Sequence, residues 1–160
     1  MPAFEIADLK SLKQHEGREF PATDWFVMSE KRIQNFSEAT EDFQWIHTNV
    51  ERARRESPFG GTIAHGFLTL SLLSHWVKQV FEIRAGVAMG VNYGLNRVRF
   101  PSAVRAGSKV RACVTLFSVE ESVGFVDVVF RIRVESQGVD DQPSTKPCCV
   151  AEWLVRYYAK

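Results

Sequence analysis

Several features are scarce in this 160-residue chain, and each shortage excludes a class of protein. The three cysteines, Cys113, Cys148 and Cys149, form no C-x-x-C pair, so we expect reduced structural thiols rather than disulfides. Lysine and arginine number 20 against 19 acidic residues, a formal charge of +1, which argues against nucleic acid or an acidic membrane as the main partner. The longest apolar run, near residues 62–77, is interrupted by polar residues and is shorter than the roughly 20 residues of a spanning helix, so no membrane span is expected.

Recognisable cofactor and targeting signals are missing as well. Residues 1–8 have neither a basic start nor a continuous apolar core, so we expect no secretory signal and a cytoplasmic location. There is no glycine-rich phosphate loop, no nucleophile elbow and no metal-ligand spacing, so no cofactor and no metal are expected. The chain also lacks internal repeats and has the length of one domain, so residues 1–160 are predicted to form a single domain.

The most distinctive stretch runs from Gly60 to Phe81. Between residues 67 and 73 apolar side chains fall on every side of the helical turn, which predicts a helix whose first half is enclosed. Farther on, polar residues spaced by three or four give a stripe, so the second half is expected to reach water. The helix would start at His65-Gly66, where unpaired backbone N–H groups can receive a developing oxyanion.

The C-terminal half of the chain predicts a sheet. Four long valine-rich segments lie near residues 89–99, 109–119, 124–135 and 148–158, separated by breaks that contain glycine, proline or polar residues. Residues 125–134 alternate between apolar and polar side chains, which predicts one dry and one wet face. One helix wrapped by an antiparallel sheet of long strands is the arrangement of the hotdog fold, in the α+β class.

The N-terminal third predicts smaller elements. Residues 6–15 are expected to form a short outer helix that ends at Gly17, and residues 25–28 a first strand. Ser29 is a suitable N-cap for a helix through Ala39, with Ile33, Phe36 and Ala39 or Thr40 facing inward. Residues 51–56 form a charged helical turn that ends before Ser57-Pro58.

Asp42 and His47 are the first candidate catalytic residues, because a carboxylate and an imidazole can share the acid and base steps of one reaction. Five helical steps of about 100° would leave them roughly 140° apart, so they can cooperate only if the helix breaks between them. The apolar residues Phe43, Trp45 and Ile46 could keep such a site dry. The spacing alone favours two loop residues that have no joint role.

Three blocks of sequence carry a resemblance to a known family. They are Ala39-Thr40-x-Asp42-x-Gln44-Trp45-Ile46-His47, then residues 57–68 with Ala64-His65-Gly66, then Asn92-Tyr93-Gly94-Leu95-Asn96-x-Val98-Arg99-Phe100-Pro101. In this order they resemble the MaoC-like dehydratase family, most closely its NodN-like branch, over nearly the whole chain. Two positions depart from the family pattern: Glu41 replaces the usual glycine before the aspartate, and Gln44-Trp45 replaces the commoner Asn-Pro.

The resemblance implies R-specific hydration of a trans-2-enoyl-CoA, or dehydration of a 3-hydroxyacyl thioester, by a homodimer of hotdog domains. Coenzyme A then belongs to the substrate, and Asp42 and His47 hold the reacting water. We expect the Gly66 N–H to stabilise the thioester oxygen. His65 would either contact the substrate or hydrogen-bond backbone to fix the turn. Asn92 would either orient the thioester or satisfy a strand bulge.

Two other functions remain open from the sequence. Hotdog domains also act as acyl-CoA thioesterases, in which a carboxylate activates water to attack the carbonyl carbon. A non-catalytic acyl-thioester-binding subunit of a dimer would need the fold without the pair. The presence of both Asp42 and His47 favours the hydratase.

Overall fold

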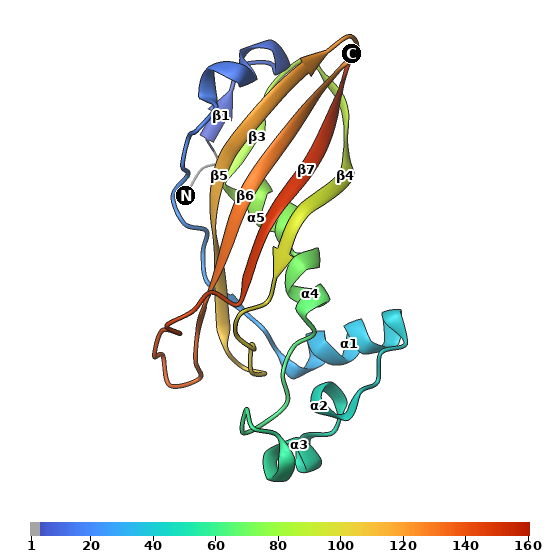
Figure 1. Ribbon diagram of the computed structural model, residues 1–160, viewed down its shortest axis with the longest axis vertical. Helices are drawn as coiled ribbons and strands as arrows, with labels where there is room; N and C mark the ends of the chain where they lie inside the picture. The colour runs from blue at the N-terminus through green and yellow to red at the C-terminus, as the bar shows by residue number, and fades with distance from the viewer. Residues whose placement is uncertain (1–3) are drawn as a thin grey trace.

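The computed structural model describes residues 4–160, in which four long strands curl around a helical segment (Figure 1). Three further helices gather at one end of the molecule (Figure 1). The elements in chain order are β1 (Phe4–Ile6), the 3₁₀ helix η1 (Leu9–His15), β2 (Phe26–Val27), α1 (Glu30–Thr40), α2 (Trp45–Thr48), α3 (Val50–Glu56), α4 (Gly66–Ser71), α5 (Leu73–Val80), β3 (Phe81–Ile83), β4 (Val87–Arg99), β5 (Lys109–Ser122), β6 (Phe125–Gln137) and β7 (Cys149–Ala159).

The main sheet has five strands in the order β2-β5-β6-β7-β4, and all its pairings are antiparallel. On β6, Val128, Phe130, Ile132 and Val134 are buried, while Arg131 and Arg133 are exposed. The predicted dry face is therefore confirmed, and it packs on α5. A parallel pair of short strands, β1 and β3, closes one end of the core.

The central helix forms as predicted, but it ends slightly earlier and its first half is less buried than expected. A turn at Leu72 divides it into α4 and α5, and the chain leaves the helix after Val80 to form β3. The first half is less enclosed than expected, because Phe67 in α4 is 70% exposed although Leu68 and Thr69 are buried. The second half confirms the expected polar stripe, since His75 and Lys78 are exposed while Trp76 on the opposite side is buried. The sheet encloses α5, while α4 emerges beside the edge strand β4 (Figure 1). None of the helices in residues 4–160 is long and apolar enough to cross a membrane.

The N-terminal predictions need correction. Ile6 belongs to β1, and η1 starts only at Leu9, because the Asp8 carboxylate accepts the Ser11 N–H as an N-cap. This 3₁₀ helix is not peripheral, since Leu12 is fully buried in the core. The strand predicted at residues 25–28 shrinks to Phe26–Val27.

The start of α1 and the end of α3 were predicted correctly. The Ser29 side chain accepts the Arg32 N–H at the start of α1, and Ile33 is buried as expected. The inward face continues through Ser37, which is fully buried, rather than through Ala39 or Thr40, which are exposed. Ser37 is the next residue on the face of Ile33, one helical turn later.

Strand β4 is the exposed edge of the main sheet. It pairs with β7 along one side, and within residues 4–160 its other side has no strand partner. Its apolar side chains remain open to solvent: Met89, Val91, Tyr93 and Leu95 are 42–57% exposed. A long apolar edge of this kind is a template for pairing with another strand.

Candidate active site

The predicted break between Asp42 and His47 is confirmed. Helix α1 ends at Thr40, and Glu41 adopts a left-handed conformation with φ 58° that turns the chain. Helix α2 then begins at Trp45 and carries His47. The Asp42 carboxylate accepts the Gln44 N–H at 3.3 Å, so its position in this turn is fixed by the backbone that follows it.

His47 is held by one hydrogen bond that determines which nitrogen is free. Its Nδ1 lies 2.6 Å from the Ile63 carbonyl oxygen, which can only accept, so Nδ1 carries the proton and Nε2 has a free lone pair. The Ile63 N–H in turn donates to the Ile46 carbonyl at 3.0 Å and fastens α2 to the segment before α4. Burial lowers the pKa of His47 below its usual value near 6.5. Electrostatic interaction with His65 lowers this pKa further, whereas the Ile63 hydrogen bond and Asp42 oppose the shift. At neutral pH the imidazole is therefore uncharged.

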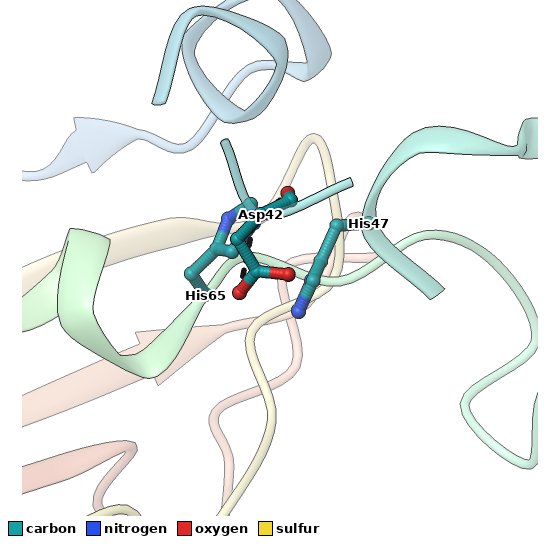
Figure 2. A group of neighbouring side chains, drawn as sticks. All are labelled: Asp42, His47 and His65. Atoms are coloured by element: carbon teal, nitrogen blue, oxygen red, sulfur yellow. Dashed lines mark hydrogen bonds and ion pairs between the residues drawn. The ribbon is translucent and has the colours of Figure 1, made fainter. Parts of the chain in front are cut away.

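His65 lies beneath the pair rather than in the opening. It is 3% exposed, and its Nε2–H donates to the backbone carbonyl of Asp42 at 3.1 Å. Its ring stacks on that of His47 with 3.7 Å between centroids and 25° between planes. Figure 2 shows these two rings gathered with Asp42, whose carboxylate and a His47 nitrogen point to the same side. His65 thus fixes the turn, which is the backbone role considered from the sequence.

Three contributors to this arrangement were not assigned to the site from the sequence, although Phe36 was correctly expected to face inward. Ser37 Oγ lies 3.4 Å from His65 Nε2 and donates to the Ile33 carbonyl, while the Phe36 ring lies 5.0 Å from the His65 ring. The third is the Ile63 carbonyl. The inward face of α1 could have indicated Ser37, but no sequence signal marks a backbone carbonyl.

Gly66 lies in the same hollow as His47. The hollow has a volume of about 320 Å³, and its walls also include Phe59, Thr69, Phe100 and Cys148. A Cβ at Gly66 would meet the Phe100 ring at 2.9 Å, so a side chain does not fit there without movement. As the first residue of α4, Gly66 has a backbone N–H that no carbonyl within the helix can satisfy.

Asn92 is not brought to this cluster. It is exposed on β4 and lines a second groove of about 380 Å³ together with Phe67 and Leu70. A register shift between Asn92 and Gly94 places a bulge at this point of β4, so the bulge considered from the sequence is present.

The cluster has the spacing that a cation would need. Among residues 4–160, Asp42, His47 and His65 are the one group of such side chains whose ligand atoms lie within 4.8 Å of one another. His65 Nε2 already donates to Asp42 and its Nδ1 is buried, which leaves the Asp42 carboxylate and His47 Nε2 to bind. This is fewer than the three or four protein ligands of zinc sites.

The free groups suit acid and base chemistry on a water molecule. The Asp42 carboxylate, whose side chain is 53% exposed, lies beside the His47 imidazole, and His47 lines a mainly apolar hollow. The Gly66 N–H on the hollow's wall adds a hydrogen-bond donor for a carbonyl oxygen. A substrate with a carbonyl next to the reacting carbon atoms can use all three.

Comparison with known proteins supports the same assignment. Residues 11–141 match the model of the MaoC like domain family. The chain is 44% identical to 3-hydroxyacyl-thioester dehydratase Z of Mycobacterium tuberculosis, covering 99% of this chain and 100% of that protein. It is 38% identical to nodulation protein N of Rhizobium leguminosarum bv. viciae, covering 96% and 91%.

Solved structures confirm the hotdog fold. The monoamine oxidase regulatory protein of an Archaeoglobus species aligns over 100% of this chain and 99% of its own, with a TM-score of 0.75 and 21% identity. The R-hydratase of Pseudomonas aeruginosa aligns over 91% and 83%, with a TM-score of 0.67 and 19% identity. With a family match over most of the chain and two relatives along nearly all of it, this protein belongs to the MaoC-like dehydratase family.

Proposed function

We propose that the protein adds water reversibly to trans-2-enoyl-CoA to give the (R)-3-hydroxyacyl thioester. The observation that carries the proposal is the meeting of the Asp42 carboxylate and the free Nε2 of His47 across the break between α1 and α2. The relative that is 44% identical is named a 3-hydroxyacyl-thioester dehydratase, the same reaction in reverse.

The chemistry requires three tasks. A water molecule must lose a proton as its oxygen bonds to the β-carbon, the α-carbon must gain a proton, and the thioester oxygen must be stabilised as it takes up negative charge. Asp42 and His47 perform the two proton steps as one unit. The depressed pKa of His47 keeps its lone pair available to accept a proton from water at neutral pH.

Gly66 serves the third task in this proposal. Its N–H belongs to the wall that His47 also lines, and the lack of a side chain lets a thioester approach the backbone closely. His65 acts through Asp42 and His47 and does not touch the substrate, because it is almost completely buried. Asn92 does not orient the thioester at this cluster, since it lies in the second groove.

The test is the hydration of crotonyl-CoA. Loss of the enoyl absorbance without release of free thiol supports the hydratase, whereas free thiol would indicate a thioesterase. No change with any enoyl-CoA would favour a non-catalytic binding subunit. An enantiospecific dehydrogenase acting on the product then identifies the (R) configuration, and an (S) product would contradict the stereochemistry.

We also propose that the protein is a homodimer joined through β4. Two copies can pair this exposed edge and bury the apolar side chains of Met89, Val91, Tyr93 and Leu95. Light scattering at micromolar concentration should give about twice the 18.2 kDa mass of one chain. A monomeric mass would contradict the dimer without affecting the proposed reaction.

A further inference from the structure

The outer face of the main sheet carries a cluster of arginines, here called the arginine face. Its four members come from β4 and β6 and line a hollow of about 590 Å³: Arg97, Arg99, Arg131 and Arg133. Arg99 and Arg133 both pair with Val150 of β7, so these residues stand in one row across three strands. Residues paired in this way share a face of the sheet. The row is on the solvent side, since Arg131 and Arg133 are exposed on either side of the buried Ile132.

The charge of the arginine face is only partly balanced. Arg131 makes an ion pair with Glu152 at 3.2 Å, and Arg133 makes one with Glu135 at 3.0 Å. Arg97 and Arg99 form no ion pair with any acidic side chain of residues 4–160. Arg99 donates instead to the Val98 carbonyl at 2.7 Å. Because the whole chain has a formal charge of only +1, this excess is a local feature and not a general basicity.

The arginine face lies at the end of the sheet that holds the catalytic hollow. Arg99 is followed directly by Phe100, which lines that hollow. Val150 stands two residues after Cys148, another residue of its wall, and at about 3.4 Å for each extended residue the two are about 7 Å apart. In Figure 1 this is the end of β6 and β7 nearest to α1, α2 and α3. A partner bound to the arginine face therefore lies beside the reacting groups.

The surroundings of the arginine face suit a protein partner. The Arg131 guanidinium lies 3.7 Å from the centre of the exposed Phe117 ring, and the Arg111 guanidinium lies 4.5 Å from that of Trp25. Arginine and aromatic residues are the types enriched in protein interfaces.

The charge of the face decides which partner fits. A second copy of the chain is disfavoured, because a two-fold contact through this face would bring the same arginines together. The homodimer proposed through β4 leaves the face open, since strand pairing extends a sheet sideways and does not cover its outer surface. The occupant that complements the face is an acidic protein.

We propose that the arginine face docks an acidic acyl carrier protein, which brings the enoyl group to the catalytic hollow as a thioester on its phosphopantetheine arm. Carboxylates of the carrier form charge-assisted hydrogen bonds with the guanidinium groups, above all with the unpaired Arg97 and Arg99. The arm ends in the same thioester as coenzyme A, so Asp42 and His47 act on it without any change of chemistry. This inference rests on the proposed hydratase function, because it identifies a second carrier of the same substrate.

The test compares three crotonyl thioesters: crotonyl-pantetheine, crotonyl-CoA and crotonyl-acyl carrier protein. Arg97→Glu and Arg133→Glu should each lower kcat/KM for the carrier-bound substrate about tenfold relative to crotonyl-pantetheine, because the reversed charge repels the carrier. Lys10→Glu is the matched control, since it makes the same change of net charge at an exposed position of η1, at the opposite end of the molecule, and it should leave this ratio unchanged. In the wild type, added salt should lower kcat/KM for the carrier-bound substrate much more than for crotonyl-pantetheine.

Calorimetric binding of the carrier protein without an acyl group tests docking without turnover, and both variants should weaken it about tenfold. If the ratio and the binding stay within twofold of the wild type in both variants, or if the carrier does not bind, the docking is wrong. Equal losses for crotonyl-CoA and the carrier-bound substrate would mean that the arginines bind the phosphates of either thioester, and the protein partner would again be wrong. If the wild type hydrates none of the three thioesters but carrier binding follows the expected pattern, the docking stands and the proposed reaction fails.

Discussion

Apolar residues at the two ends of the central helical segment have different roles. At the buried end, α5 places Trp76 and Val77 under the sheet, where they are almost completely inaccessible. At the site end, α4 begins with Gly66 and Phe67 beside the catalytic hollow and leaves the Phe67 ring largely in solvent. Both ends are rich in apolar residues, yet one end stabilises the fold and the other lines the hollow that we propose as the substrate site.

This difference predicts that the two ends respond to mutation in opposite ways. Substitutions in the buried end should reduce stability, because packed atoms are lost and a cavity forms. Substitutions of Asp42 and His47 should change activity with little effect on stability, because these polar side chains are exposed or partly exposed. The predictions below test this division from the largest expected effect to the smallest.

The largest effect is expected for Trp76→Ala. Trp76 is fully buried and packs edge to face on Phe26, so its removal should cost about 3–5 kcal/mol of unfolding free energy. Urea unfolding at fixed protein concentration measures the loss. Phe67→Ala, the same kind of truncation in α4, should stay within about 0.5 kcal/mol of the wild type. Equal losses in the two variants would show that α4 is as firmly packed as α5.

The exposed Phe67 ring shows why the sequence predicted the fold but not the whole surface. Hydrophobic periodicity correctly indicated a helix and four long strands, because these patterns reflect local geometry. It could not indicate that β4 would be the last strand in the sheet, beside which the Phe67 side of α4 is open to solvent. Strand order arises from contacts between distant segments, such as β4 with β7, and no local pattern encodes it.

The next largest effect concerns the proposed catalytic pair. Asp42→Asn and His47→Gln should each lower kcat for crotonyl-CoA by at least ~100-fold, and the double variant should be little worse, because the two groups act on one water molecule. Thermal melts should show that all three variants fold. Losses that multiply in the double variant, or near-normal turnover in either single variant, would contradict the shared-water mechanism.

A smaller effect is expected for His65→Phe. The phenyl ring can still stack on His47, but the hydrogen bond to the Asp42 carbonyl is lost, so kcat should fall about tenfold, the value of one such bond. Without the electrostatic interaction with His65 the pKa of His47 should rise toward 6.5, although burial, the main cause of its depression, remains. The uncharged form of His47 would then be lost at a higher pH.

The pH dependence of kcat tests this positioning role. As pH falls, the acid-side loss of activity should begin at a higher pH in His65→Phe than in the wild type, and kcat at neutral pH should also be lower. A variant with reduced kcat but an unshifted profile would mean that His65 only supports the fold of the turn.

The site itself was predicted in part, for identifiable reasons. Asp42, His47 and Gly66 stand in motifs, and the geometric requirement for a helix break between the first two is met. The buried position of His65 depends on α1 packing against the segment before α4, through Ser37 and Phe36. Asn92 also stands in a motif, but the path of β4 carries it to the other groove.

The smallest effect is expected at Glu41, where the sequence departs from the family's glycine. With φ 58° at the end of α1, Glu41 occupies a conformation that costs a residue with a side chain about 1 kcal/mol or more, and its negative charge lies at the unfavourable end of the helix dipole. Glycine has no such penalty but loses more entropy on folding, so Glu41→Gly should stabilise the protein by a net ~0.5–1 kcal/mol in urea unfolding. Because the backbone of the turn already has the shape that glycine favours, kcat should change less than twofold. Glu41→Ala separates the causes, since it removes the charge but keeps the strained φ: if it stabilises as much as glycine does, charge rather than backbone conformation accounts for the gain.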